Sequence, residues 1–422
     1  MLIYLIIFLL STGYCILESF STVFFQNFYT VLFVISLCAL FVYNVKQISS
    51  NEEFGFKKIL IQFFIIHFGF GIGGYFTNSN VNFFWVTDSV NTHLPEALKY
   101  LKFLKGEISF SQIGEFAGVS THLVTGIFIG IFGENSFSTV MAQFVFKTIS
   151  ISATYLICLK LWDRRTGLIA ILLYGLCPTV MLYNLVLYKE SASQAYFSLS
   201  LLFLINVFVD KKYWHFVFLL FSVVLLLNER FYLAYLFLLM LPYFIYNLPF
   251  KKSFFRVFMF GVLIFLIFYG AYLFNYKQAL NNFSLIDKIK GYRAHHQGFS
   301  DVKQGLNYSI PYPLAVVKLF FTPYFALNKF NMFFNISTLL TWGSFINQLI
   351  VGCSLIGFYK LVREKFLYFV LWLPFIVFIT VTAYVSPWNG RLRDSFYCCI
   401  VCYASYFLVQ NNLFKKWLLT NK

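Results

Sequence analysis

The amino-acid sequence predicts an all-α, polytopic helical membrane protein with about twelve transmembrane helices and two long outer loops that carry interfacial helices. Of its 422 residues, 60% are hydrophobic and 11% are charged, whereas a soluble domain carries about 25% charged residues. Apolar runs of 16 to 24 residues recur from end to end, close to the ~20 residues that cross a bilayer as a helix. The alternating segments typical of a β-barrel are not seen, so residues 1–422 are expected to form a single integral membrane domain.

In chain order, the apolar runs predict spans near residues 2–17, 25–45, 58–76, 137–159, 166–184, 192–209, 213–228, 231–248, 257–274, 337–359, 366–385 and 395–411. The first run lacks a preceding basic stretch and an A-x-A-like cleavage site, so we expect a retained span rather than a signal peptide. The eight cysteines lie mostly inside apolar runs, and the one C-x-x-C pair, Cys399 and Cys402, lies within a span. Core packing is therefore expected for them, rather than a zinc site or a disulfide framework.

The basic residues predict the orientation of the chain. Of the 32 Lys and Arg residues, 17 lie in six short segments together with five acids, which gives these segments a net charge of +12. The positive-inside rule makes this side cytoplasmic, with both termini inside. The two long loops, residues 77–136 and 275–335, then lie on the outer (periplasmic) face. The net charge of +16 is thus a signal of topology and does not indicate a nucleic-acid partner.

The first outer loop contains a helical pattern that follows a carboxylate. Apolar residues recur at helical spacing from residue 90 to residue 104, which predicts a helix lying flat at the membrane interface. Asp88 stands just before this helix, where partial desolvation suits a general base; capping the helix is the alternative role. His93 lies five residues on, and the short apolar run 122–132 predicts a re-entrant or interfacial helix.

Two pairs of opposite charges lie at the outer ends of expected spans. Lys189 is followed by Glu190, and Glu229 is followed by Arg230. Ionisable groups at a membrane edge are costly unless they are paired, hydrated or functional. An adjacent ion pair in a short hydrated loop is one explanation for Lys189 and Glu190. The convergence of Asp88, Glu190 and Glu229 on one face favours a functional site instead.

Basic and aromatic residues in the second outer loop predict binding of a sugar phosphate. Arg293 and His295 lie among tyrosines there, and Arg391 and Arg393 stand before the last span. Arginine binds phosphate oxygens through a bidentate fork. Contact with anionic headgroups is the alternative for the loop, and interfacial anchoring is the alternative for Arg391 and Arg393. A metal site at His295 and His296 would need further ligands.

Three stretches carry a family resemblance: VTDSVNTHLPEALKYLKFLKGE in the first outer loop, LWDRRTGLIAILLYGLCPTVMLYNLVLYKESASQ in the middle, and WNGRLRDSF before the last span. In their order they resemble the GT-C superfamily of membrane glycosyltransferases, in the branch of bacterial surface-polysaccharide assembly that includes O-antigen and capsule polymerases. The resemblance implies a polyprenyl-phosphate or polyprenyl-diphosphate donor and outward-facing transfer to a hydroxyl acceptor. Asp88 matches the position of the catalytic Asp of the family, and Ser89 stands where many members have a second acid.

We therefore expect a multi-pass glycosyltransferase of the bacterial inner membrane that takes part in O-antigen or capsule assembly. Its expected partners are a polyprenyl-linked sugar donor, a glycan or lipid-linked acceptor and membrane lipids; no cofactor is expected, although a divalent metal stays open. The expected catalytic residues are Asp88 as the base, with Glu190 and Glu229 orienting the acceptor or holding arginines. The expected substrate-binding residues are His93, Lys189, Arg230, Arg293, His295, Arg391 and Arg393.

Two other functions compete with this one. The first is a polymerase that joins whole lipid-linked repeat units, which breaks the same kind of glycosyl–phosphate bond. The second is a flippase or transporter of lipid-linked oligosaccharides, which the long one-sided loops disfavour. A non-catalytic scaffold would need a soluble binding module, and the sequence contains none that is recognisable.

Overall fold

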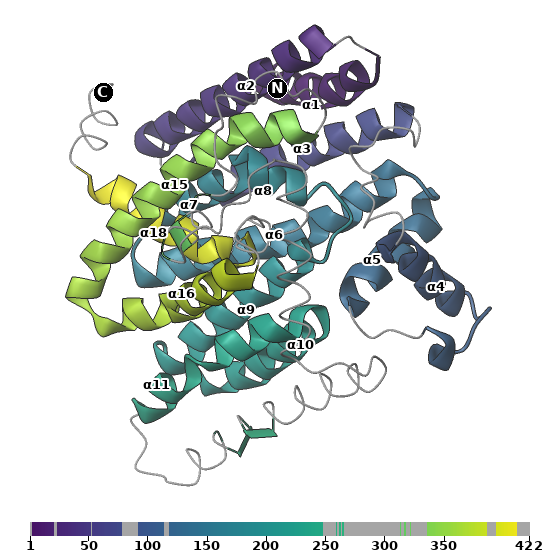
Figure 1. Cartoon of the computed structure of the whole chain (residues 1–422). Helices are drawn as coiled ribbons and strands as arrows, with labels where there is room; N and C mark the ends of the chain where they lie inside the picture. Colours follow the sequence, from purple (N-terminus) through teal and green to yellow (C-terminus); the bar gives the residue numbers. More distant parts are fainter. Residues whose placement is uncertain are drawn as a thin grey trace.

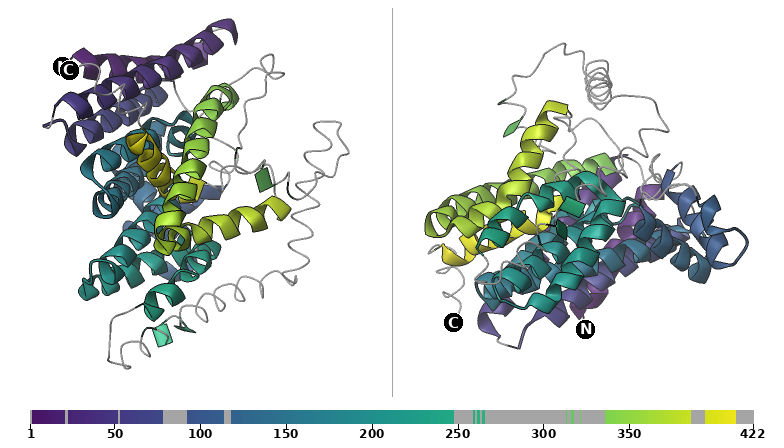
Figure 2. Two further views of the ribbon diagram at one scale, coloured as in Figure 1. Left: turned by 90° about the vertical axis from the view of Figure 1, so that its left-hand side faces the viewer. Right: turned by 90° about the horizontal axis from the view of Figure 1, so that it is seen from below.

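The computed structural model describes residues 2–20, 23–51, 53–77, 92–113, 118–247, 336–385 and 394–411, with a few positions between 259 and 321. The regular secondary structure of these residues is helical, without a strand, so the all-α class is confirmed for them. The helices form a bundle. Helices α1 (Leu2–Phe20) and α2 (Val23–Ser50) lie at one edge, and α10 (Phe216–Leu238) and α11 (Leu241–Tyr246) lie at the opposite edge (Figures 1 and 2).

The N-terminal edge of the bundle is held by a close helix contact. Helix α3 (Phe56–Phe76) packs on α1. A Cβ atom on Gly69 would lie 2.8 Å from Cβ of Ser11, and one on Gly73 would lie 2.7 Å from Cβ of Cys15. Small residues four positions apart let membrane helices approach closely. These two glycines therefore determine how near α1 and α3 can lie.

Helix α6 (Ser136–Leu161) occupies the centre of the bundle. It packs against α3, α5 (Val119–Phe132), α7 (Arg164–Leu176), α9 (Glu190–Phe208) and α18 (Tyr397–Gln410). Helix α15 (Ile336–Glu364) packs on α18, and α16 (Phe366–Val385) packs on α15. The side-chain amide of Asn135 accepts a hydrogen bond from the backbone N–H of Ser138 (3.0 Å), which caps α6. Asp163 caps α7 in the same way at Thr166 (2.7 Å).

Six described segments are long and apolar enough to cross a membrane. They are Tyr29–Ser50, Phe56–Phe76, Ser136–Leu161, Glu190–Phe208, Tyr213–Arg230 and Gly343–Glu364. Most of the other expected spans fall on shorter or interrupted helices, and the expected span 257–274 lies almost entirely outside the described residues. The total of about twelve spans and their orientation therefore stay predictions.

The expected span 166–184 is interrupted, which corrects its prediction as one helix. Helix α7 ends at Leu176, and α8 (Pro178–Tyr183) begins at Pro178. Cys177 between them is extended, with φ −64° and ψ 114°, because a residue that precedes proline is disfavoured in the helical region. The chain then turns, and α9 begins at Glu190.

Two short helices of the first long loop lie beside the bundle (Figure 1). Helix α4 covers Leu94–Leu104 with Pro95 in its first turn, and α5 covers the short apolar run. A Cβ atom on Gly126 of α5 would lie 2.7 Å from the carbonyl oxygen of Ala97, so the two helices cross closely. The segment with Asp88, residues 78–91, lies outside the described residues, as does most of the second long loop.

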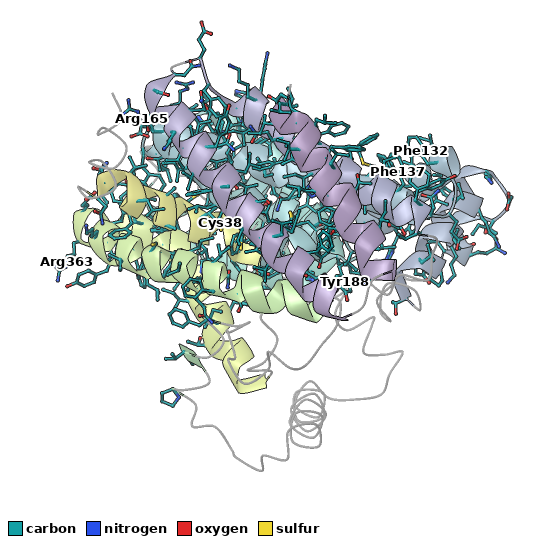
Figure 3. The ribbon with its side chains drawn as sticks, turned by 90° about the horizontal axis from the view of Figure 1, so that it is seen from above. Cys38, Phe132, Phe137, Arg165, Tyr188 and Arg363 are labelled. Atoms are coloured by element: carbon teal, nitrogen blue, oxygen red, sulfur yellow. The ribbon has the colours of Figure 1, made fainter. Side chains whose placement is uncertain are left out.

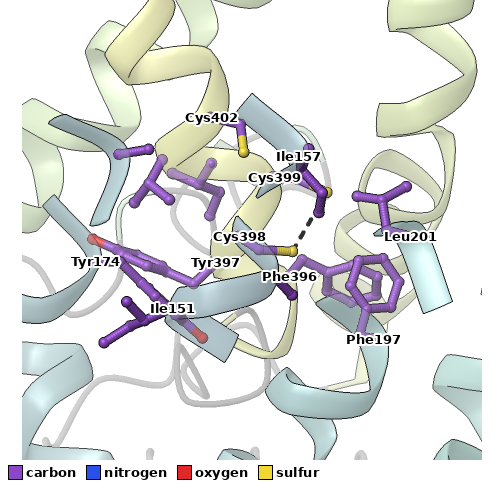
Figure 4. Packing of buried hydrophobic residues seen from close by; sticks show 14 of the residues in the cluster. Ile151, Ile157, Tyr174, Phe197, Leu201, Phe396, Tyr397, Cys398, Cys399 and Cys402 are labelled. Atoms are coloured by element: carbon purple, nitrogen blue, oxygen red, sulfur yellow. Dashed lines mark hydrogen bonds between the residues drawn. The ribbon is translucent and has the colours of Figure 1, made fainter. Parts of the chain in front are cut away.

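The core around α18 contains a cluster of cysteines (Figure 4). Cys398, Cys399 and Cys402 are buried, and their labelled neighbours include Phe197 and Tyr397. All eight cysteines of the chain are free thiols. The expected packing role is confirmed for the six buried cysteines, whereas Cys38 is exposed and Cys353 is half-buried.

Candidate functional site

Glu229 joins α10 to the first turn of α5. Its Oε1 accepts hydrogen bonds from the backbone N–H groups of Ser120 (2.9 Å) and Thr121 (3.1 Å), and its Oε2 accepts one from Oγ1 of Thr121 (2.9 Å). The first N–H groups of a helix have no partner within the helix, and a negative charge is favoured there by the helix dipole. The buried carboxylate of Glu229 therefore caps α5 from a residue more than a hundred positions away.

Gly118 allows this junction to close. It adopts a left-handed conformation, φ 85° and ψ 26°, which side chains other than glycine rarely adopt. Its N–H donates to the carbonyl oxygen of Asn228 (3.0 Å). A Cβ atom there would lie 2.5 Å from Cε of Lys189 and 2.9 Å from Cε1 of His122. The aliphatic part of Lys189 thus passes over Gly118, and its ammonium group acts electrostatically on Glu229.

Arg230 leaves the helical conformation and pairs with a buried glutamate. Its φ of −148° and ψ of 88° bend α10 at this residue, where the sequence predicts the boundary between two spans. Its Nη2 lies 2.5 Å from Oε1 of Glu190, and its Nη1 donates to Oη of Tyr232 (2.7 Å). The side chain of Glu190 is 1% exposed and that of Arg230 is 17% exposed. Removing one partner of such a buried pair strongly destabilises the fold, because the remaining charge is left buried and uncompensated.

One ion pair is therefore exchanged between helices. Glu190 pairs with Arg230 of α10 rather than with Lys189, its neighbour in sequence, whereas the carboxylate of Glu229 is held by Ser120 and Thr121. The hydrated-loop explanation does not describe Glu190, which is buried. The exchange fixes the start of α9 against the bend in α10.

Two histidines extend the site toward α4. Nδ1 of His93 lies 3.1 Å from Nε2 of His122, and both rings are at most 9% exposed. The pKa of His122 is lowered to about 2, mainly by burial and next by the positive charge of Lys189. The ring of Tyr100 lies 6.3 Å from that of His122. The pKa of Tyr100 is raised to about 12, mainly by burial and next by the negative charge of Glu229. At neutral pH, His122 is therefore uncharged and Tyr100 is protonated.

Five of the ten expected site residues are brought together by these contacts: His93, Lys189, Glu190, Glu229 and Arg230. The other five lie outside the described residues: Asp88, Arg293, His295, Arg391 and Arg393. Two functional candidates were not predicted from the sequence, His122 and Tyr100. For His122, the available signal was a histidine at the start of a short apolar run. Tyr100 is one of 29 tyrosines and carries no signal of its own.

The site lies away from the basic turns. In Figure 3, Arg165 and Arg363, which come from two of those turns, lie on the left, and Tyr188, which precedes Lys189, lies on the right. Within the described part of the chain, no group of three or more His, Cys, Asp or Glu side chains could hold a metal ion. Glu190 holds Arg230 and Glu229 holds the first turn of α5, so these charged groups position helices.

Comparison with known proteins yields one family match. Residues 120–272 match the family model of dolichyl-phosphate-mannose-protein mannosyltransferase, a family with the GT-C fold. The matched range is just over a third of the chain, and it contains Lys189, Glu190, Glu229, Arg230 and His122. No curated protein and no solved structure matches the chain. The match and the apolar helices support a multi-pass membrane glycosyltransferase that uses a lipid-linked sugar.

Proposed function

We propose that the protein transfers a sugar from a polyprenyl-phosphate or polyprenyl-diphosphate donor to a hydroxyl acceptor during bacterial O-antigen or capsule assembly. One observation carries the proposal: the buried ion pair between Glu190 of α9 and Arg230 of α10 lies within the stretch that matches a lipid-linked mannosyltransferase family. Buried charges in a membrane protein are costly and usually functional. Their coincidence with the matched stretch favours sugar transfer over transport.

The chemistry assigns each group a task. The acceptor oxygen forms a bond to the anomeric carbon of the sugar, and the bond from that carbon to the phosphate oxygen breaks. A base takes the proton of the acceptor hydroxyl, and cations stabilise the departing lipid phosphate. We assign the base to Asp88 and the phosphate contacts to Arg293, Arg391 and Arg393.

The described residues support this chemistry by holding the site in place. Glu190 fixes Arg230, and Glu229 fixes the first turn of α5. Lys189 is partly exposed. Of Lys189, Glu190, Glu229 and Arg230, it is the one that we place nearest the lipid phosphate. His93 begins the helix that follows Asp88 in sequence, and its contact with His122 ties that helix to α5.

The proposal is tested in the native host by deletion and complementation. Loss of the gene should alter the surface glycan, and wild-type protein should restore it. Asp88→Asn should accumulate in the membrane without restoring the glycan, whereas Glu107→Gln, which changes an exposed acid in the same loop, should restore it. Full restoration by Asp88→Asn would refute the assignment of the base.

The same strain separates the two enzymatic alternatives. Chains that end after a single complete repeat unit would indicate a polymerase of whole repeat units. A repeat unit that lacks one sugar would indicate a transferase that adds that sugar. Loss of the surface glycan with complete lipid-linked oligosaccharide accumulating on the inner face would indicate a flippase.

A further inference from the structure

A stripe of buried polar side chains runs along α6, the central helix of the bundle. Its members are all completely buried and recur at positions i, i+4, i+7 and i+11, which lie on one face of a helix: Gln143, Lys147, Ser150 and Thr154. A polar face on a membrane-spanning helix is costly unless it lies against other polar groups. The proposed sugar transfer does not use these residues.

Helix α9 carries a second polar stripe. Ser191, Gln194 and Ser198 recur at positions i, i+3 and i+7, and each is at most 1% exposed. Gln194 is four residues after Glu190, so the two side chains lie one turn apart on the same face of α9. The stripe therefore runs along α9 away from the ion pair of Glu190 with Arg230.

The two stripes meet at Tyr174 of α7. Nζ of Lys147 donates a hydrogen bond to the carbonyl oxygen of Tyr174 (3.2 Å) and lies 4.4 Å from the centre of its ring. Oη of Tyr174 donates to Oε1 of Gln194 (2.8 Å). The rings of Phe146 and Tyr196 meet edge to face beside these contacts, with centres 6.1 Å apart. Helices α6 and α9 are thus neighbours at this level of the bundle, and one tyrosine contacts the polar stripes of both.

The junction has hydrogen-bonding capacity to spare. Within the described part of the chain, neither amide atom of Gln143 has a hydrogen-bond partner, and the same holds for Nε2 of Gln194 and Oγ of Ser191. The ammonium group of Lys147 has three N–H donors, of which one bonds to Tyr174. Buried polar groups without partners are costly, above all inside a membrane. Water both donates and accepts hydrogen bonds, so it suits a mixed set of amides, hydroxyl and ammonium groups.

We propose that this junction of α6, α7 and α9 is a binding site for ordered water. Water molecules there bridge Gln143, Gln194 and Ser191, and the ammonium group of Lys147 is a further donor. A buried water makes about three hydrogen bonds, and these side chains supply both donors and acceptors. The site continues the polar region around Glu190 into the membrane-spanning part of the bundle. It does not depend on the proposed function.

Radiolytic labelling of the purified protein in phospholipid nanodiscs tests the proposal. An X-ray pulse splits water wherever it is bound, and the hydroxyl radicals add oxygen to the side chains beside it, which mass spectrometry of the peptides measures. Tyr174 should be oxidised several-fold faster than Tyr403, which is also buried and donates its hydroxyl group to the backbone carbonyl of Tyr368. Equal rates for the two tyrosines would overturn the proposal.

Radicals made in bulk solution distinguish bound water from solvent that enters from outside. Photolysis of added hydrogen peroxide produces hydroxyl radicals only where peroxide can diffuse. It should label neither Tyr174 nor Tyr403, because both are buried. Rapid labelling of Tyr174 by this route would overturn the proposal, since bulk solvent would then account for its oxidation.

The variant Gln143→Leu tests the residues of the site, because it removes both unpartnered amide atoms and keeps a side chain of similar size. The X-ray oxidation of Tyr174 should fall to the level of Tyr403. The matched control is Gln62→Leu, since Gln62 is as deeply buried but exchanges two hydrogen bonds with Asn44 (2.7 and 3.1 Å). The control should leave the oxidation of Tyr174 relative to Tyr403 as in the wild type.

Unchanged oxidation of Tyr174 in Gln143→Leu would overturn the proposal. If this variant does not accumulate, the comparison of Tyr174 with Tyr403 in the wild type decides.

Discussion

The pairing of Glu190 with Arg230 predicts a large coupling between two residues that are forty positions apart. In Glu190→Gln, the guanidinium group keeps Tyr232 as a partner but loses its carboxylate. Breaking a buried ion pair costs about 3–5 kcal/mol. Because Arg230 keeps a partner and its side chain is 17% exposed, we expect about 3 kcal/mol, the lower end of this range.

Arg230→Gln should cost about as much, since it leaves the carboxylate of Glu190 buried without its cation. The double variant should then cost about 3 kcal/mol rather than about 6 kcal/mol, because no uncompensated charge remains. The coupling free energy would be about 3 kcal/mol. It is measured by unfolding the four proteins in mixed micelles with increasing dodecyl sulfate, followed by tryptophan fluorescence.

The control is the pair of Glu96 and Lys99, which are 2.7 Å apart on α4, with 45% of the lysine side chain exposed. Its coupling should be below about 0.5 kcal/mol, as for other exposed pairs of a helix. If Glu190 and Arg230 coupled as weakly as this control, the exchanged pairing between α9 and α10 would be wrong.

Four further predictions follow from the site and the topology. Gly118→Ala should lower both Tm and the transfer rate, because the left-handed backbone at this residue (φ 85°) is strained for alanine; equal Tm would show that the junction can relax. The lowered pKa of His122 predicts a Tm that falls as pH drops from about 6.5, the ordinary histidine value, since the unfolded chain then binds a proton that the folded protein excludes. His122→Asn should flatten this slope, and an unchanged slope would refute the explanation. Cysteine placed at Ser300 should react with a membrane-impermeant thiol reagent in intact cells, and failure to react would invert the topology. Arg391→Lys should reduce transfer although it keeps the charge, because lysine lacks the bidentate fork; equal activity would leave only an anchoring role.

The site could be located from the sequence because charge is rare in this chain. With 11% charged residues, two adjacent pairs at the ends of apolar runs stand out, and the predicted topology places both on the same face of the membrane. The pairing of Glu190 with Arg230 could not be predicted. It depends on the rotation of α9 against α10 and on the extended conformation of Arg230, neither of which a local pattern encodes.

The helices differ in how far they could be predicted. The apolar stripe predicted α4, although the buried face is formed by Leu94, Ala97 and Tyr100, and Leu104 at the end of the stripe is 49% exposed. The break before Pro178 was missed, although its physical cause is local, since a hydropathy average does not register a single proline. Lys147 was missed for the same reason: one lysine hardly changes the mean hydropathy of a 26-residue helix.

The central claim is that the protein moves a sugar from a lipid phosphate to a hydroxyl group. Purified protein in phospholipid nanodiscs, given a panel of polyprenyl-phosphate and polyprenyl-diphosphate sugars with a labelled sugar moiety, tests it most directly. We predict that the wild type transfers label to a glycan acceptor and releases the lipid phosphate, and that Asp88→Asn does neither. A folded wild-type protein that leaves every donor intact, and instead moves a labelled lipid-linked sugar across the bilayer of a sealed vesicle, would contradict the claim.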